Sequence, residues 1–154
     1  MTAGLVTVHI MGLPLEVFRR ASEHSDELLR EFALITEKDS EHVPARLLAL
    51  IDELRLRFGG FTEGPTHAIQ EALDRGDAEV DVRYEVPEGV ADGAKQLGAL
   101  LDEADAFCQS GDLLTLATLP ESLAFRQWYL EEFVRQVQGS TPRSWSAFLE
   151  SAPG

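Results

Sequence analysis

The sequence has a single cysteine, Cys108, and only two lysines among its 154 residues. One cysteine excludes an internal disulfide and a zinc site built from several thiolates. The 13 basic side chains are outnumbered by 27 acidic ones, which gives a formal net charge of −14. Because this charge repels phosphate backbones and anionic headgroups, we expect neither nucleic acid nor a membrane surface as a partner.

Long hydrophobic runs are also missing. No apolar run approaches the roughly 20 residues that a transmembrane helix needs. The first apolar stretch, residues 5–13, is interrupted by Thr7 and His9 and lacks the basic region and cleavage site of a signal peptide. We therefore expect a cytoplasmic protein.

Catalytic motifs with strict spacing are absent as well. The chain has no nucleophile elbow, dinucleotide-binding glycine turn or phosphate-binding loop. Its four histidines lie in separate segments without metal-ligand spacing; His24 falls in an apolar helical stripe, where we expect it to be packed. Cys108 occupies an inner stripe position and is expected to be buried and unreactive. The sequence predicts no catalytic residue, no cofactor and no metal site.

Three segments have the patterns of strands. In residues 78–86, valines and Tyr84 alternate with charged side chains, which is typical of a strand with one buried and one exposed face. Residues 5–11 form a run rich in β-branched side chains, which predicts a strand covered on both faces. Residues 113–118 predict a third strand. A sheet of three strands has two edges, which makes a homodimer a further expectation.

Helical patterns fill most of the remaining chain. Apolar residues recur every three or four positions in five segments that begin near prolines, and four of these segments end at glycines. We expect a helix-rich α/β (α+β) fold of two layers, with a small three-stranded sheet and about five helices. A single domain should span residues 1–139, with residues 140–154 as a short C-terminal tail that docks on it. The predicted helices cover residues 15–37, 44–58, 65–75, 90–110 and 120–138.

The order of these elements resembles the ATP-binding fold of histidine kinases and anti-sigma serine kinases. Residues 47–58 are similar to the second helix of that family, with Glu53 at the position of its carboxylate but Arg57 at the position of its metal-binding asparagine. Residues 97–107 are similar to the helix after the nucleotide lid, and residues 89–98 would be a shortened lid. The family's Asp-x-Gly-x-Gly motif is missing, so the resemblance implies a related fold without ATP turnover.

The whole chain also resembles small acidic actinobacterial proteins that accompany the ATP-binding regulators, phosphatases and antagonist domains of partner-switching systems. Residues 8–18 (VHIMGLPLEVF), 100–108 (LLDEADAFC) and 125–136 (FRQWYLEEFVRQ) carry this resemblance. It implies a role in bacterial signalling and supplies no catalytic residues.

The acidic charge is concentrated in one quarter of the chain. Residues 77–112 carry two basic and ten acidic side chains, which is −8 of the net −14. We interpret Asp81, Glu85, Asp102 and Asp105 as an acidic face that binds a protein with a basic surface. The expected function is a non-catalytic regulatory domain that binds another protein. Two alternatives stay open: a degenerate nucleotide-binding protein that retains Glu53, and a small-molecule sensor with an apolar pocket.

Overall fold

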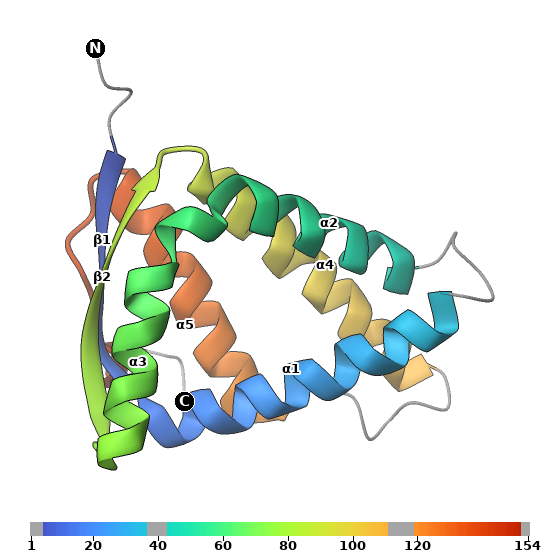
Figure 1. The fold of residues 1–154 in the computed structure, drawn as a ribbon, viewed down its shortest axis with the longest axis horizontal. Helices are drawn as coiled ribbons and strands as arrows, with labels where there is room; N and C mark the ends of the chain where they lie inside the picture. The colour runs from blue at the N-terminus through green and yellow to red at the C-terminus, as the bar shows by residue number, and fades with distance from the viewer. Residues whose placement is uncertain (1–4, 37–42, 111–118, 152–154) are drawn as a thin grey trace.

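The computed structural model describes residues 5–36, 43–110 and 119–151 and has a helix-rich α+β fold, 75% helical (Figure 1). Within these ranges, six α-helices and one short 3-10 helix accompany a two-stranded antiparallel sheet. No helix in the described ranges is long and apolar enough to cross a membrane. The elements are β1 (Leu5–Pro14), α1 (Leu15–Thr36), α2 (Val43–Phe58), η1 (Gly59–Phe61), α3 (Glu63–Arg75), β2 (Glu79–Pro87), α4 (Val90–Ser110), α5 (Pro120–Val137) and α6 (Trp145–Ser151).

The five long helices form where the apolar spacing predicts them, and they differ from the prediction mainly at their ends. α3 begins at Glu63, two residues before Pro65, because a proline is tolerated throughout the first helical turn. Gly76 ends α3 in the left-handed conformation, with φ of 76°, which glycine adopts without steric cost. The tail contains a short helix, α6, which agrees with the short helical turn that its apolar residues Trp145 and Phe148 predict.

The two strands separate a buried face from an exposed one. Val8 lies opposite Tyr84, and both side chains are buried, whereas Thr7 and Glu85 lie opposite each other and are exposed. The alternation predicted for β2 is therefore confirmed. The expectation that the first strand is covered on both faces is wrong, since Leu5 is 54% exposed. A run of β-branched residues indicates a strand but does not say how many faces the helices cover.

In the part of the chain that the structure describes, the sheet has two strands rather than the expected three. The third predicted strand, residues 113–118, lies outside the described residues and stays a prediction.

A β-bulge lets β1 continue past Gly12, where the sequence pattern indicated its end. The register shifts between Ile10 and Leu13, so two residues of β1 occupy the space opposite Asp81. Gly12 has a φ of 65°, and its N–H donates a 2.7 Å hydrogen bond to Oδ1 of Asp81. A glycine with positive φ at such a position bends the strand and strengthens its twist.

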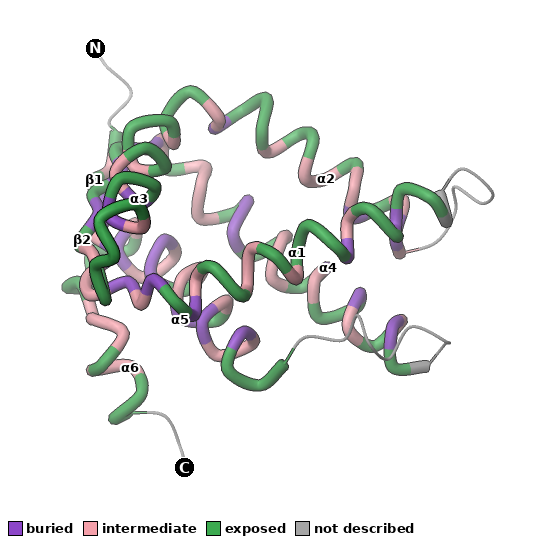
Figure 2. The backbone as a smooth tube through the Cα atoms, turned by 60° about the horizontal axis from the view of Figure 1, so that its bottom comes forward, coloured by how far each residue is buried: buried purple, intermediate pink, exposed green. Residues whose placement is uncertain are grey.

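α1, α2 and α4 extend away from the sheet, which lies at one end of the molecule, whereas α3 runs alongside β2 (Figure 1). α3 packs on β2 and α5 packs on β1, and buried residues gather where the sheet meets α5 (Figure 2). A second, smaller core joins α1, α2 and α4 around Phe32, Leu47 and Ala104. α2 covers this core incompletely, and its Leu56 is 88% exposed.

A buried carboxylate on α5 organises the packing of the C-terminal region. The side chain of Glu132 is 0% exposed. Its Oε1 accepts hydrogen bonds from Nε2 of Gln136 at 3.0 Å and from the backbone N–H of Arg143 at 2.8 Å. Its Oε2 accepts from Nη1 of Arg135 at 2.6 Å. These partners satisfy a charge whose burial would otherwise be costly.

The tail docks on the body through aromatic side chains. The indole N–H of Trp128 donates a 2.8 Å hydrogen bond to the backbone carbonyl of Arg143. The ring of Trp145, at the start of α6, lies 5.5 Å from that of Trp128 and 6.0 Å from that of Phe125. Aromatic pairs at these separations add to the free energy of burial, so α6 is held by both packing and hydrogen bonding.

Substitution of the buried carboxylate should destabilise the fold far more than substitution of its neighbour. Glu132→Ala leaves the donors of Arg135, Gln136 and Arg143 without their acceptor, and we expect it to lower the free energy of unfolding by about 3–5 kcal/mol. The matched control is Glu131→Ala, which removes an exposed contact to Arg143 and should cost about 0–1 kcal/mol. Urea denaturation measures both values, and equal losses would contradict a structural role of Glu132.

Candidate functional site

The four residues of the expected acidic face lie on two separate elements. Asp81 and Glu85 are exposed on β2, in the sheet, whereas Asp102 and Asp105 lie in the second half of α4, which runs away from the sheet (Figure 1). The structure therefore brings together two pairs of acidic residues rather than one continuous face.

The α4 pair is held by an arginine of α5. Nη2 of Arg126 lies 2.8 Å from Oδ1 of Asp102 and 3.0 Å from Oδ2 of Asp105. The side chains of Arg126 and Asp105 are only 15% and 16% exposed, whereas that of Asp102 is 68% exposed. Arg126 therefore neutralises part of the negative charge of α4 and holds α4 against α5. Less of that charge is available to attract a partner.

The β2 pair belongs to a row of exposed charges on the outer face of the sheet. Glu79, Asp81, Arg83 and Glu85 are all exposed, while the residues between them point toward the core. Three of the four side chains are acidic. Part of the negative charge that the sequence locates in residues 77–112 is thus presented here on the exposed face of a strand.

The backbone of β2 also has an open edge, which the pairing geometry identifies. In antiparallel pairs, opposite residues alternately bond each other or direct both backbone groups away from each other. His9 directs its backbone N–H and carbonyl away from β2. The N–H donates to Oε1 of Gln136 and the carbonyl accepts from Nε2 of Gln136, both at 2.8 Å. Since Arg83 lies opposite His9, the N–H and carbonyl of Arg83 also point away from β1.

The two edges of the sheet therefore differ. Gln136 closes the edge of β1 at His9, using a side-chain amide in place of a neighbouring strand. At the edge of β2, by the same alternation, Arg83 and Glu85 direct their backbone groups outward, and no bond from another described element reaches them. An open strand edge is a template for pairing with another extended chain.

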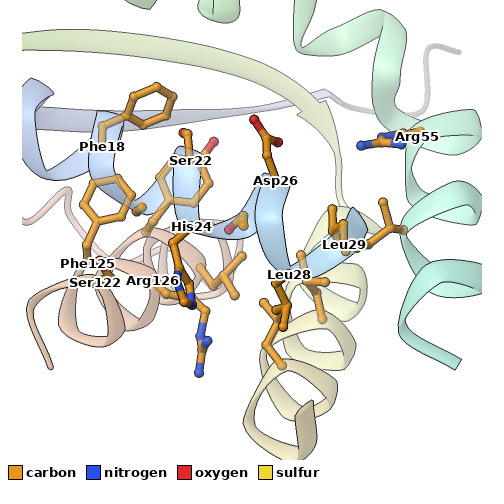
Figure 3. A pocket seen from close by; sticks show the side chains of 17 residues that line it. Phe18, Ser22, His24, Asp26, Leu28, Leu29, Arg55, Ser122, Phe125 and Arg126 are labelled. Atoms are coloured by element: carbon orange, nitrogen blue, oxygen red, sulfur yellow. The ribbon is translucent and has the colours of Figure 1, made fainter. Parts of the chain in front are cut away.

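A pocket of about 380 Å³ opens between the four helices α1, α2, α4 and α5 (Figure 3). Aliphatic side chains from α1, α2 and α4 and aromatic side chains from α1 and α5 make up most of its wall. It is lined by Phe18, Ala21, Ser22, His24, Ser25, Asp26, Leu28, Leu29, Ile51, Arg55, Leu97, Leu101, Ser122, Phe125, Arg126, Tyr129 and Leu130.

One buried polar atom among the described residues of this pocket has no partner. Nε2 of His24 is buried and makes no hydrogen bond with any described residue. The sequence predicts a packed, hydrogen-bonded His24; the side chain is half-buried, and its buried Nε2 lacks the hydrogen-bonding partner usual for such an atom. The hydroxyl groups of Tyr129 and Tyr84, in contrast, satisfy each other at 2.7 Å.

Sequence reasoning did not find this pocket. Its wall is drawn from four helices, and its apolar lining residues follow the same periodicity that builds an ordinary core. His24 carried the one usable signal, because it places a polar ring in an apolar stripe. That signal could not distinguish a pocket from a closed core.

The residues on which the expected kinase-like fold rested have other structural roles. The expected lid comprised residues 89–98, and all of them but Gly89 lie in the first turns of α4. A Cβ at Gly93 would lie 2.8 Å from Cδ2 of Leu54, so this glycine lets α2 and α4 approach closely. Glu53 is exposed on α2, and the guanidinium of Arg57 lies 4.9 Å from the ring centroid of Phe58. The lid expectation is therefore wrong, because the segment is helical.

Cys108 is buried, as its position in the apolar stripe of α4 predicts. Burial raises the pKa of its thiol, and the carboxylate of Asp105 raises that pKa further. A thiol in such surroundings is a poor nucleophile.

No protein-family model matches the chain, and comparisons with curated proteins and with solved structures found no match. The family resemblances of the sequence therefore remain expectations.

The tyrosine pair predicts how stability depends on high pH. Tyr84 and Tyr129 are the two tyrosines of the chain, and burial raises the pKa of both hydroxyls above the ordinary value of 10.0. The unfolded chain loses these protons near pH 10 while the folded chain keeps them, so stability should fall as the pH rises through about 10. An alkaline titration followed by tyrosinate absorbance should show native ionisation later than in urea; coincident curves would contradict the buried pair.

The arginine of α5 predicts unequal roles for its two carboxylates. Asp105→Ala removes a partly buried partner of Arg126 and should lower the free energy of unfolding by about 1–3 kcal/mol. Asp102→Ala removes an exposed partner and should cost about 0–1 kcal/mol. Thermal or urea unfolding of the two variants decides the point, and a larger effect at Asp102 would be inconsistent with this geometry.

Proposed function

We propose that this chain is a non-catalytic regulatory domain that binds another protein by adding an extended segment of the partner to the open edge of β2. The supporting observation is the orientation of Arg83 opposite His9, which directs an N–H and a carbonyl outward from the sheet. Main-chain bonding at such an edge supplies affinity, and the side chains on the sheet face supply specificity.

Charge favours a basic partner. Glu79, Asp81 and Glu85 outnumber Arg83 on the exposed row, so a segment with basic side chains on the same face would place opposite charges across the strands. Gly12 orients Asp81 through its backbone N–H. The net charge of −14 would also accelerate encounter with a basic protein at low salt.

The resemblance to proteins of partner-switching systems gives this proposal its cellular setting: the cytoplasm of a bacterium, in a signalling complex.

A second copy of the chain is the competing occupant of the edge of β2. Antiparallel pairing of β2 with its own copy around Tyr84 would place Arg83 opposite Glu85 twice, so the experiment must separate self-association from binding to another protein.

The first experiment places a photo-crosslinking amino acid at Glu85 in cells of the source organism. We expect an adduct to a different protein with a basic surface, identified by mass spectrometry. The same crosslinker at Gln70, which is exposed on α3, is the control. Identical adducts from both positions, no adduct, or an adduct only to a second copy of this chain would contradict the proposal.

Charge reversal then tests the role of the acidic row. The Asp81→Lys, Glu85→Lys double variant should slow association with the crosslinked partner by about tenfold or more at low salt, and the effect should shrink at high salt. The Asp102→Lys, Glu103→Lys double variant changes the net charge by the same amount and is the control on α4, where we expect the association rate to change little. Surface plasmon resonance measures both rates, and equal slowing would show that only net charge matters.

A proline tests the backbone bonding itself. Arg83→Pro removes an N–H that faces away from β1, so pairing within the sheet is retained. We expect this variant to weaken partner binding at least about threefold relative to Arg83→Ala, which keeps the N–H. Thermal unfolding checks that the fold persists. Equal binding by the folded proline and alanine variants would overturn strand addition.

A further inference from the structure

The pocket between α1, α2, α4 and α5 has a wall suited to a flat, mostly apolar molecule. Its volume of about 380 Å³ falls in the range of small-molecule sites. The rings of Phe18 and Phe125 meet edge to face at 6.2 Å, and Phe125 stacks on Tyr129 at 5.9 Å. Such a cluster offers ring edges and faces to an aromatic guest.

Among the described residues of this wall, His24 carries the buried side-chain atom that has no hydrogen-bond partner. That atom is Nε2, and a buried polar atom without a hydrogen bond is destabilising. Figure 3 shows His24 on α1 and Arg126 on α5 turned to the same side of the pocket. A ligand that enters here can supply the missing bond.

The charges around the pocket favour a neutral ligand. Nη2 of Arg126 already contacts Asp102 and Asp105, so the positive charge of the guanidinium is balanced. Arg55 is exposed on α2 and extends toward α1 from the rim (Figure 3). A carboxylate placed beside His24 would therefore be desolvated without a dedicated counter-ion, which is unfavourable.

We propose that this pocket binds a small aromatic molecule with a single hydroxyl group, and that the hydroxyl forms a hydrogen bond with Nε2 of His24. The aromatic body lies against Phe18, Phe125 and Tyr129. The site is separate from the edge of β2, so it is a second binding function and does not depend on the protein partner.

Three probes with the same ring system test the chemistry of the ligand. 1-Naphthol, naphthalene and 1-naphthoate differ only in the group that would face His24. We expect 1-naphthol to bind most tightly, with naphthalene about three- to tenfold weaker, as the loss of one hydrogen bond implies, and 1-naphthoate weakest. Titration calorimetry measures the three affinities. Tightest binding of 1-naphthoate, or no binding of any probe, would overturn the proposal.

Variants of the wall test the location. His24→Phe keeps a ring but removes the nitrogen, so 1-naphthol and naphthalene should bind it with equal affinity. Ala21→Trp places an indole in the pocket and should abolish binding of both probes. His67→Phe, on the exposed surface of α3, is the matched control and should behave as the wild type. Retention of the naphthol preference in His24→Phe would contradict the assignment.

A measurement on the wild-type protein avoids dependence on folding of the variants. The ring nitrogens of histidine are resolved by nitrogen-15 magnetic resonance, and 1-naphthol should shift the Nε2 resonance of His24 while leaving that of His67 in place. Naphthalene should shift Nε2 of His24 much less. Absence of a naphthol-specific shift at His24 would overturn the proposed hydrogen bond even if the probe binds elsewhere.

Discussion

The buried contact between Glu132 and Gln136 is the interaction on which the rest of the structure depends. Glu132 is 0% exposed and holds the amide of Gln136 at 3.0 Å, which leaves that amide correctly oriented to bond both backbone groups of His9. The same carboxylate receives the backbone N–H of Arg143. One charged side chain on α5 thereby holds the edge of β1 through Gln136 and the backbone of Arg143, which precedes α6.

This arrangement makes the sheet asymmetric. Since a side chain of α5 closes the edge of β1, β2 is left as the strand whose backbone faces outward at Arg83. Charged side chains on an edge strand usually discourage uncontrolled pairing. In this chain they would also select the partner, because three of the four exposed side chains on β2 are acidic. The open edge and the acidic row are two properties of one strand, and together they support a binding role.

Local patterns predicted much of the fold. The alternation along residues 79–87 located β2 to within one residue, and the spacing that ends at Cys108 located α4. Prolines near helix starts and glycines after helix ends set most boundaries. The bulge at Gly12 was missed because a glycine ends a strand as readily as it bends one. The expected acidic face was assembled from sequence proximity, whereas α4 carries Asp102 and Asp105 away from the sheet to Arg126.

The sequence by itself determined the helix-rich class, the exposed acidic strand and the burial of Cys108, because periodicity, turn residues and charge density act over a few neighbouring positions. Only the tertiary structure decided which strand edge is closed, which acidic residues are paired and where the pocket lies. Those outcomes depend on partners far apart in the chain: His9 and Gln136 are separated by 127 positions, and the pocket needs residues from four helices. A local sequence pattern cannot predict contacts between residues so far apart. The same glutamine or histidine would fit the periodicity of its helix whichever elements packed beside it.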